Sequence, residues 1–107
     1  MLIKAQPVID AVEAIVTPLM KRRSDFKILF PSPSKEMFTQ KHAYSFSKVK
    51  HLIFVCGRYE GIDYRFEEYM TAKYPSAFQK ISLGQFVLLG GEVASMTMIE
   101  AIARLIP

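Results

Sequence analysis

Apolar residues recur with helical spacing near both ends of the chain. Pro7 suits the first turn of a helix, because the N–H that proline lacks would have no partner there. The positions that follow at three- and four-residue steps predict one apolar helical stripe; they are Val8, Ala11, Val12, Ile15 and Leu19. Pro18 is expected to end this helix early. A final helix is predicted from a second such series, Met96, Ile99, Ile102 with Ala103, and Ile106.

Short apolar runs between these helices predict buried strands. FKILF at residues 26–30 and HLIFVC at residues 51–56 are bounded by polar or proline-rich segments, as strands of a covered parallel sheet are. FVLL at residues 86–89 predicts a further short strand. The alternation with helices predicts an α/β fold, a mostly parallel sheet with helices on both faces.

Two further helices are expected between the strands. Ser34 is a candidate N-cap for a helix that continues to about residue 43. Residues 42–50 fit neither helix nor strand clearly, although Phe46 and Val49 are expected to face a core. Residues 63–74 predict a charged helix with Phe66, Tyr69 and Met70 on one side.

Length and composition limit the class of protein. The 107 residues are enough for one small domain, and no apolar run approaches the roughly 20 residues of a membrane span. The single Cys56 excludes an internal disulfide and a multi-cysteine zinc site, and a lone thiol fits a reducing cytoplasm. The formal charge of +4 permits a nucleic-acid partner. Lys21-Arg22-Arg23 is the one tight basic run, and a solvated loop accounts for it when it is taken alone.

Both ends of the sequence fall beside apolar segments. The chain starts on Met1, Leu2 and Ile3 and stops at Pro107, directly after a helical pattern. We therefore expect residues 1–107 to be a piece of a larger protein, and its N-terminus is not that of a signal peptide.

Three loops are expected to form one ligand site. In open parallel sheets ligands bind beyond the carboxyl ends of the strands, where the loops 31–34, 57–61 and 83–91 leave the predicted sheet. Glycines in two of them let backbone groups approach a ligand closely. The spacing matches neither G-x-x-x-x-G-K-[ST] nor G-x-G-x-x-G. The pattern therefore predicts a ligand bound by backbone hydrogen bonds and apolar contacts rather than by phosphate charge.

Plainer interpretations exist for the same residues. The glycines are also typical of ordinary turns, and Arg58 with Glu60 fits a solvated ion pair of little energetic weight. Cys56 is expected to be a small core residue. His42 and His51 lack the spacing of metal ligands, so no metal site is expected. Met96 and Met98 are expected to be packing residues.

Taken together, the motifs carry a more specific indication. FVCGRYEGIDYR, ISLGQFVLLGGE and MIEAIARLIP, in this order and spacing, resemble the bacterial tRNA (guanine-N1)-methyltransferases of the SPOUT class. MLIKAQPVIDAVEAI and FPSPSKEMFTQ resemble the preceding segments of that family, so the likeness covers nearly the whole chain.

The resemblance implies a SPOUT-type parallel sheet with a C-terminal trefoil knot, and S-adenosylmethionine bound in that knot. It also implies a cytoplasmic homodimer with shared active sites, no membrane association, and methylation of tRNA at N1 of guanine 37, just 3′ of the anticodon. The positions that match the cofactor loops of the family are Ser32, Pro33, Gly57, Tyr59, Glu60, Gly61, Leu83, Gly84, Phe86, Leu88, Gly90 and Gly91.

Catalytic roles follow from the same resemblance. Arg104 matches an arginine that stabilises negative charge on the guanine as N1 loses its proton, although a cation at a helix C-terminus is also favoured by the macrodipole. Glu60 matches a position that orients the substrate or Mg²⁺ in the full enzyme. Gln85 and Leu89 depart from the usual Asp and Thr of the cofactor segment, so cofactor affinity is expected to be reduced.

Three hypotheses remain open at this point. The first is the cofactor-binding core of the tRNA methyltransferase. The second is a catalytically inactive dimeric knot that binds S-adenosylmethionine, because the aspartate that is the general base of the family lies beyond Pro107, as does its C-terminal tRNA-binding domain. The third is an unrelated flavodoxin-like nucleotide domain, which would have neither knot nor dimer.

Overall fold

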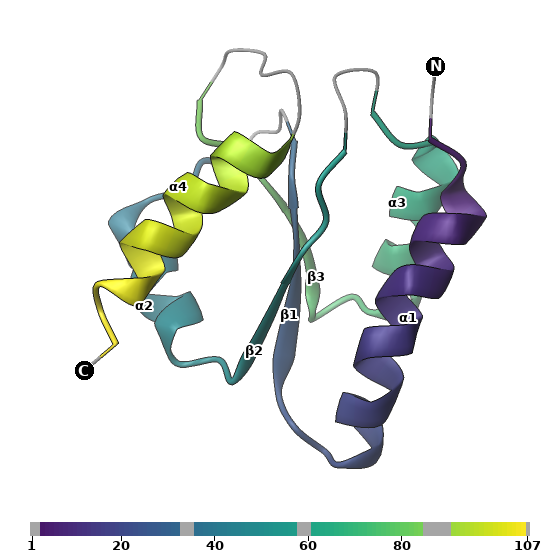
Figure 1. Ribbon diagram of the computed structural model, residues 1–107, viewed down its shortest axis with the longest axis horizontal. Coiled ribbons are helices and arrows are strands. Elements are labelled where there is room, and N and C mark those ends of the chain that lie inside the picture. The colour runs from purple at the N-terminus through teal and green to yellow at the C-terminus, as the bar shows by residue number, and fades with distance from the viewer. Residues whose placement is uncertain (1–2, 33–35, 58–60, 85–90, 107) are drawn as a thin grey trace.

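The computed structural model describes residues 3–32, 36–57, 61–84 and 91–106. Within them a three-stranded parallel sheet is covered by two pairs of helices (Figure 1). The elements in chain order are α1 (Ala5–Lys21), β1 (Phe26–Pro31), α2 (Gln40–Ser47), β2 (His51–Phe54), α3 (Tyr64–Lys73), β3 (Phe78–Ile81) and α4 (Gly91–Ala103). The expected α/β fold with helices on both faces is confirmed.

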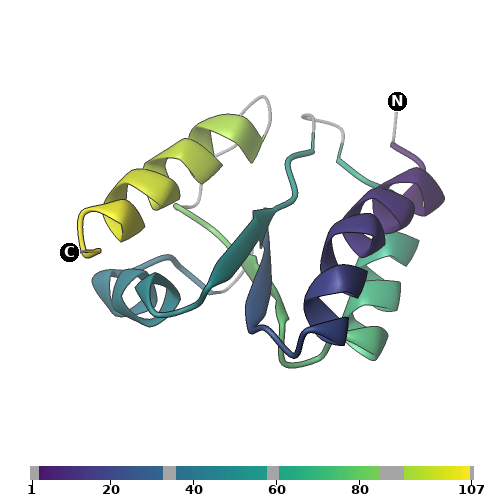
Figure 2. The ribbon, with the colours of Figure 1, turned by 60° about the horizontal axis from the view of Figure 1, so that its bottom comes forward.

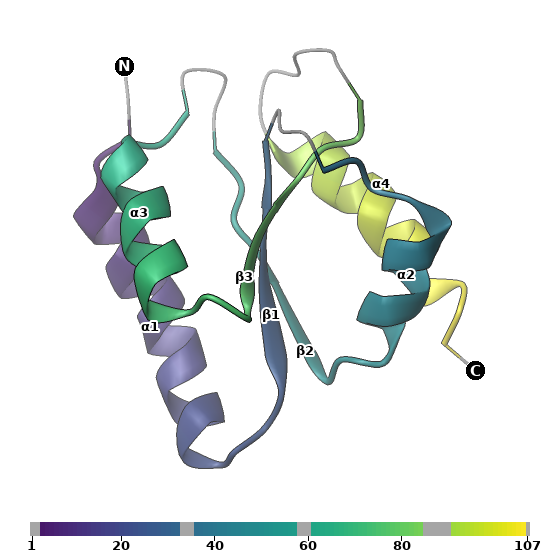
Figure 3. The same cartoon turned by 180° about the vertical axis from the view of Figure 1, so that it is seen from behind.

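The strand order is β2-β1-β3, and both pairings are parallel. Phe26 lies opposite His51 and Ile28 lies opposite Phe78, so β3 joins β1 on the side away from β2 (Figure 3). All four residues of β2 are only half-buried, because β2 is an edge strand of this sheet. The prediction of a fully buried strand over 51–56 was therefore wrong in burial and two residues too long.

The third strand, β3, was not predicted. Phe78–Ile81 is short and carries two polar residues, Gln79 and Lys80, so it lacks the apolar run that marks a buried strand. The strand predicted at residues 86–89 lies outside the described residues.

Alternate residues of β1 serve two separate cores. Ile28 and Phe30 pack with α1 and α3 on one face of the sheet, whereas Leu29 packs with α2 and α4 on the other. Figure 2 shows the two helix pairs on opposite sides of the sheet. This follows from the two-residue period of a strand, which sends successive side chains to opposite faces.

The first helix differs from its prediction in length and in its buried face. It continues through Pro18 to Lys21, because a proline removes one helical hydrogen bond without preventing the next turn, and the Pro18 carbonyl accepts from the Arg22 N–H at 3.2 Å. The buried face includes Ile9 and Val16, whereas Ile15 is 52% exposed. The predicted stripe is thus confirmed at Val12 and Leu19, half-buried at Val8, and wrong at Ala11 and Ile15, which are exposed.

The second helix begins later than expected. Thr39 is its N-cap, and the Thr39 N–H donates to Nδ1 of His42 at 3.0 Å. The prediction of a helix capped by Ser34 and ending near residue 43 was wrong, and Ser34 itself lies outside the described residues. Phe46 is buried as expected and Val49 is half-buried.

The third helix is confirmed. Asp63 caps it, since its Oδ1 accepts from the Arg65 N–H at 3.0 Å. Phe66 and Met70 are fully buried against β1 and α1. No described helix is long and apolar enough to cross a membrane.

The fourth helix is confirmed in position, but its inward face is not the predicted stripe. Met98 and Ile102 are buried with Ala94 and Ser95. Met96 is 69% exposed and Ile99 is 47% exposed, and Ile106 beyond the helix end is also exposed. Met98 is therefore a packing residue as expected, whereas the same prediction was wrong for Met96, which is largely exposed.

Candidate functional site

The carboxyl ends of the three strands meet at one edge of the sheet. The Ser32 N–H donates to the Ile81 carbonyl at 3.0 Å, and the Val55 N–H donates to the Leu29 carbonyl at 2.9 Å. The first bond places the chain after β1 beside the end of β3, and the second places the chain after β2 beside β1. The loops of interest therefore start from a common edge, drawn at the top of Figure 1.

The structure describes seven of the predicted site residues and not the others. Ser32, Gly57, Gly61, Leu83, Gly84 and Gly91 lie at or next to this edge, and Arg104 lies elsewhere. The remaining predicted residues lie outside the described residues; they are Pro33, Tyr59, Glu60, Phe86, Leu88 and Gly90. The suggested pair of Arg58 with Glu60 lies outside them too.

Gly91 and Gly57 join the start of α4 to the end of β2. The Gly91 N–H donates to the Gly57 carbonyl at 2.8 Å. A Cβ at position 91 would lie 3.0 Å from Cα of Cys56 and 3.4 Å from the Gly57 nitrogen. Since the nearest obstacle is backbone, a side chain at position 91 would force the two segments apart. Here glycine is needed for a close approach of two chain segments.

Gly61 fixes the other end of the same loop. Its φ of 82° lies in the left-handed region that side chains disfavour. The Gly61 carbonyl accepts from the Ile3 N–H at 3.1 Å, and the Ile3 carbonyl accepts from the Asp63 N–H at 2.8 Å. The first described residue of the chain therefore pairs with the segment that leaves the site.

Ser82 is a site residue that sequence reasoning missed. Its hydroxyl donates to the Gly84 carbonyl at 2.7 Å and accepts from the Gly84 N–H at 3.1 Å. Its backbone pairs with Glu36 and Phe38, on the segment that follows β1. Ser82 is buried and so orders the Leu83–Gly84 turn. The available signal was a serine two residues before a glycine, the pattern of a side-chain turn.

Cys56 is exposed, which corrects the prediction of a core residue. The reason is its place just after the edge strand β2, where the chain leaves the sheet. Its Sγ lies 3.3 Å from Oγ of Ser95, a buried residue in the first turns of α4. Cys56 thus contributes to the contact that holds α4 at this edge.

Two carboxylates flank the edge. The Glu36 pKa is lowered, first by its hydrogen bond with His42, whose Nε2 lies 3.1 Å from Oε2 of Glu36. The Asp63 pKa is lowered by hydrogen bonds from Arg65. Within ranges 3–32, 36–57, 61–84 and 91–106, His, Cys, Asp and Glu side chains form no group of three that could hold a metal ion.

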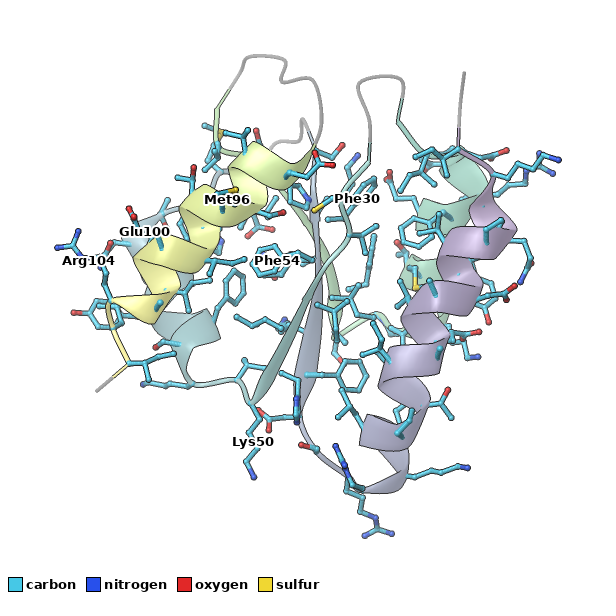
Figure 4. The ribbon with its side chains drawn as sticks, in the orientation of Figure 1. Phe30, Lys50, Phe54, Met96, Glu100 and Arg104 are labelled. Carbon is cyan, nitrogen blue, oxygen red and sulfur yellow. The ribbon has the colours of Figure 1, made fainter. Side chains whose placement is uncertain are left out.

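Arg104 is not brought to this edge within one chain. It follows the last residue of α4, is exposed, and points away from the sheet (Figure 4). Gly91 is at the opposite end of the helix. At about 1.5 Å of rise per residue, the two positions are roughly 20 Å apart. Within a single chain, then, the predicted catalytic arginine and the loop edge form two separate places.

Comparison with known proteins gives a family match over the whole chain. The family model described as "tRNA (Guanine-1)-methyltransferase TrmD" matches residues 1–107. The chain belongs to this TrmD family.

Relatives in three bacteria carry the same name, tRNA (guanine-N(1)-)-methyltransferase. Those of Bacillus pumilus (strain SAFR-032) and Bacillus subtilis (strain 168) are each 40% identical over 107 residues, which is all of this chain and 40% of each relative. That of Kocuria rhizophila is 50% identical over 80 residues, or 75% of this chain and 24% of the relative. The chain therefore spans about 40% of the length of the two Bacillus relatives, which align with all of it. The hypothesis of an unrelated flavodoxin-like domain is wrong.

Proposed function

We propose that the protein is the cofactor-binding core of an enzyme that methylates N1 of guanine 37 in tRNA. The observation that carries the proposal is the hydrogen bond between Gly91 and Gly57 at the sheet edge, in a chain that the tRNA methyltransferase family model matches from residue 1 to residue 107. The inactive knot module is not favoured, since the matched relatives all carry the name of the active enzyme. With tRNA as its substrate, the protein would work in the cytoplasm.

The described edge suits S-adenosylmethionine, which supplies the methyl group when bound. The backbone of Ser32, Gly57 and Gly84 lies at the strand ends, where the two glycines have no side chain to obstruct a ligand. Ser82 holds the Leu83–Gly84 turn through its hydroxyl, so the positions of those amides are fixed before a ligand arrives. Mg²⁺, if the full enzyme uses it, would need ligands in addition to those of the described residues, because these form no metal-binding group.

We further propose that the segment joining β3 to α4 makes the trefoil knot of the SPOUT class. The strand order supports this. β3 lies on the far side of β1 from β2, yet Gly91, the first residue described after Gly84, bonds back to Gly57, just beyond the end of β2. The described residues before and after this segment thus lie on opposite sides of β1, as a knot at the carboxyl edge would require.

A homodimer through α4 would bring Arg104 to the reaction. Met96, Ile99 and Ala103 form an exposed apolar stripe on this helix. If the α4 helices of two chains pack antiparallel through this stripe, Arg104 of each copy lies near the Gly91 end of the other. The guanidinium would then stand where negative charge develops on guanine as N1 loses its proton. The separation of Arg104 from Gly91 within one chain supports this arrangement.

The proposed function is tested by titrating S-adenosylmethionine into the chain by calorimetry, with Gly91→Arg as control. We expect binding to the parent chain and none to the variant, because the arginine cannot enter the contact with Cys56 and Gly57. Labelled methyl transfer to a tRNA transcript is then measured for the chain extended by the remaining length of the Bacillus subtilis relative. Absence of cofactor binding by the parent, or absence of transfer by the extended protein, would overturn the proposal.

A further inference from the structure

The positive charge of the chain is concentrated at the sheet edge opposite the candidate site. Two loops meet there, one between α1 and β1 and one between α2 and β2. These loops and the last residue of α1, Lys21, carry five exposed cations: Lys21, Arg22, Arg23, Lys48 and Lys50. We call these five residues the amino-edge cluster. Figure 4 shows Lys50 at this edge, near the start of β2.

The two loops are tied together by structure. Phe26 and His51 are partners at the start of β1 and β2. The Lys50 N–H donates to Oδ2 of Asp25 at 3.2 Å, so the one carboxylate of these loops is directed at a backbone group. The cations of two loops separated in sequence are thereby held at a common edge, which the basic run alone did not indicate.

The charge balance shows how uneven the distribution is. The five cations of the cluster and Asp25 together carry +4, which equals the formal net charge of the whole chain. The nine other Lys and Arg residues are therefore balanced by the nine other Asp and Glu residues. Several of those are directly paired, as in Lys73 with Glu13 and Lys80 with Glu67. Among ion pairs of the described residues, none involves the amino-edge cluster.

The backbone at Arg23 is a second, independent observation. Arg23 has φ of 55°, and it is the sole non-glycine residue with positive φ in the described ranges. The Ser24 N–H bonds to the Leu19 carbonyl and the Arg23 N–H to the Met20 carbonyl, the pattern of a Schellman motif. Arg23 occupies the left-handed position of this motif, where glycine is usually found. A strained backbone that keeps an arginine at the exposed tip of a loop indicates a use for that side chain.

We propose that the amino-edge cluster binds phosphates of the tRNA, at a distance from the base that is methylated. This rests on the proposed function, which supplies tRNA as the substrate. Guanidinium and ammonium groups on two loops suit a run of phosphates, which RNA displays along its backbone. The six residues of β1, at about 3.3 Å each, separate this edge from the cofactor edge by roughly 20 Å. An RNA bound at the cofactor edge can therefore continue to the cluster, and the contact adds affinity without sequence choice.

The test compares two variants that lose the same charge. Arg22→Gln with Lys50→Gln removes one cation from each loop of the cluster. Lys4→Gln with Lys41→Gln removes two exposed cations from elsewhere. Binding of a fluorescent tRNA transcript is measured by anisotropy across a series of KCl concentrations, and thermal unfolding is followed by circular dichroism to verify that each variant folds.

We expect the cluster variant to bind tRNA roughly tenfold more weakly at low salt, and its slope of log K against log salt to fall by about 1.5. The control variant should stay within about twofold of the parent. The cluster variant should show the same loss of affinity for a transcript with adenine in place of guanine 37 as for the natural transcript, because phosphate contacts carry no sequence information.

The outcomes separate this inference from the proposed function. Equal slopes for the two variants, with S-adenosylmethionine binding intact, would overturn the phosphate contact and leave the methyltransferase assignment standing. A parent chain that binds the cofactor but no tRNA would likewise overturn it. Loss of binding to phosphatidylserine vesicles with unchanged tRNA binding would assign the cluster to a lipid surface instead. Failure of the parent to bind the cofactor counts against the proposed function alone, since the salt slopes still decide the phosphate contact.

Discussion

The Tyr74 hydroxyl donates a hydrogen bond of 2.7 Å to Oε2 of Glu13, across 61 positions of sequence. The same oxygen accepts from the Tyr69 hydroxyl at 3.0 Å and from Nζ of Lys73 at 2.6 Å. One carboxylate on α1 thus gathers three donors from the end of α3. This cluster links α1 to α3 at the border of the core that they share. Because it contains a carboxylate and a phenol, we expect stability to depend on pH at both extremes.

On the acid side, stability should depend on Glu13. Its pKa is lowered, first by the Lys73 hydrogen bond and then by that of Tyr74. A lowered carboxylate pKa stabilises the fold above the ordinary glutamate pKa, and that contribution disappears as pH falls through the lowered value. Glu13→Gln should cost about 1–2 kcal/mol at neutral pH and flatten the acid limb of urea-unfolding free energies. Glu68→Gln, on the exposed face of α3, is the control and should change neither the unfolding free energy at neutral pH nor its decrease at acid pH. If stability falls with acid as steeply in Glu13→Gln as in the parent chain, Glu13 is not the group responsible.

On the alkaline side, stability should depend on Tyr74. Burial, followed by the hydrogen bond to Glu13, raises the Tyr74 pKa to about 12. The neutral phenol therefore stabilises the fold below the ordinary tyrosine pKa of about 10, and this contribution is lost as pH rises from there toward 12. Tyr74→Phe should reduce the loss of stability between those values. Tyr64→Phe is the matched control, because Tyr64 is exposed; identical alkaline limbs for both variants would refute the prediction.

The two glycines of the site should respond differently to alanine. At position 91 a Cβ meets backbone at 3.0 Å, whereas at position 57 its nearest neighbour is the Ile62 side chain, at 3.4 Å. Gly91→Ala should lower the unfolding free energy by about 1–3 kcal/mol and weaken cofactor binding. Gly57→Ala should lower it by less, because a side chain can shift more readily than backbone. Denaturant titration measures both, and a greater loss in Gly57→Ala would show that the α4 contact is not the constraint.

A charge on the exposed stripe of α4 should separate the proposed dimer. Met96→Asp places a carboxylate where the partner helix would pack, and a buried unpaired charge is costly. Sedimentation velocity should show monomers for this variant and dimers for the parent chain, with unchanged circular dichroism. Thr97→Asp lies beside the stripe on the same exposed helix surface and should remain dimeric. Persistence of the dimer in Met96→Asp would exclude this face as the interface.

Replacing Arg23 by glycine should stabilise the fold. The left-handed backbone at this position costs a residue with a side chain about 1 kcal/mol, and glycine adopts it freely. Arg23→Gly should therefore raise the midpoint of urea unfolding while it weakens tRNA binding. Ser24→Gly, at the next position, should not raise it. Destabilisation by Arg23→Gly would mean that the arginine side chain supports the loop.

How far sequence reasoning reached can be judged element by element. The helix over 64–73 was predictable because Asp63 caps it and Phe66 and Met70 recur on one face. The strand β3 was not, since Gln79 and Lys80 interrupt its apolar pattern and it is specified by pairing with β1 rather than by its own residues. The α4 face was misjudged for a related reason: apolar residues occur on two sides of this helix, and periodicity does not reveal which side meets the sheet.

The candidate site shows the same division. That Gly57, Gly84 and Gly91 lie at the strand ends followed from topology, because parallel strands end at one edge. Ser82 and the exposure of Cys56 depend on side-chain contacts that no spacing encodes. The separation of Arg104 from Gly91 depends on the start of α4 at Gly91, whereas the apolar series that predicted this helix began at Met96.

The strand order has a consequence for folding during translation. β1 occupies the centre of the sheet and is synthesised before both of its neighbours, and the second of them, β3, follows some fifty residues later. At synthesis rates of about 5–20 residues per second, the uncovered flank of β1 waits for seconds. Only after that can Gly91 reach back to Gly57. The nascent chain thus exposes an unpaired apolar strand during translation. The yield of folded protein in the cell should therefore depend on the chaperones that bind nascent chains at the exit tunnel.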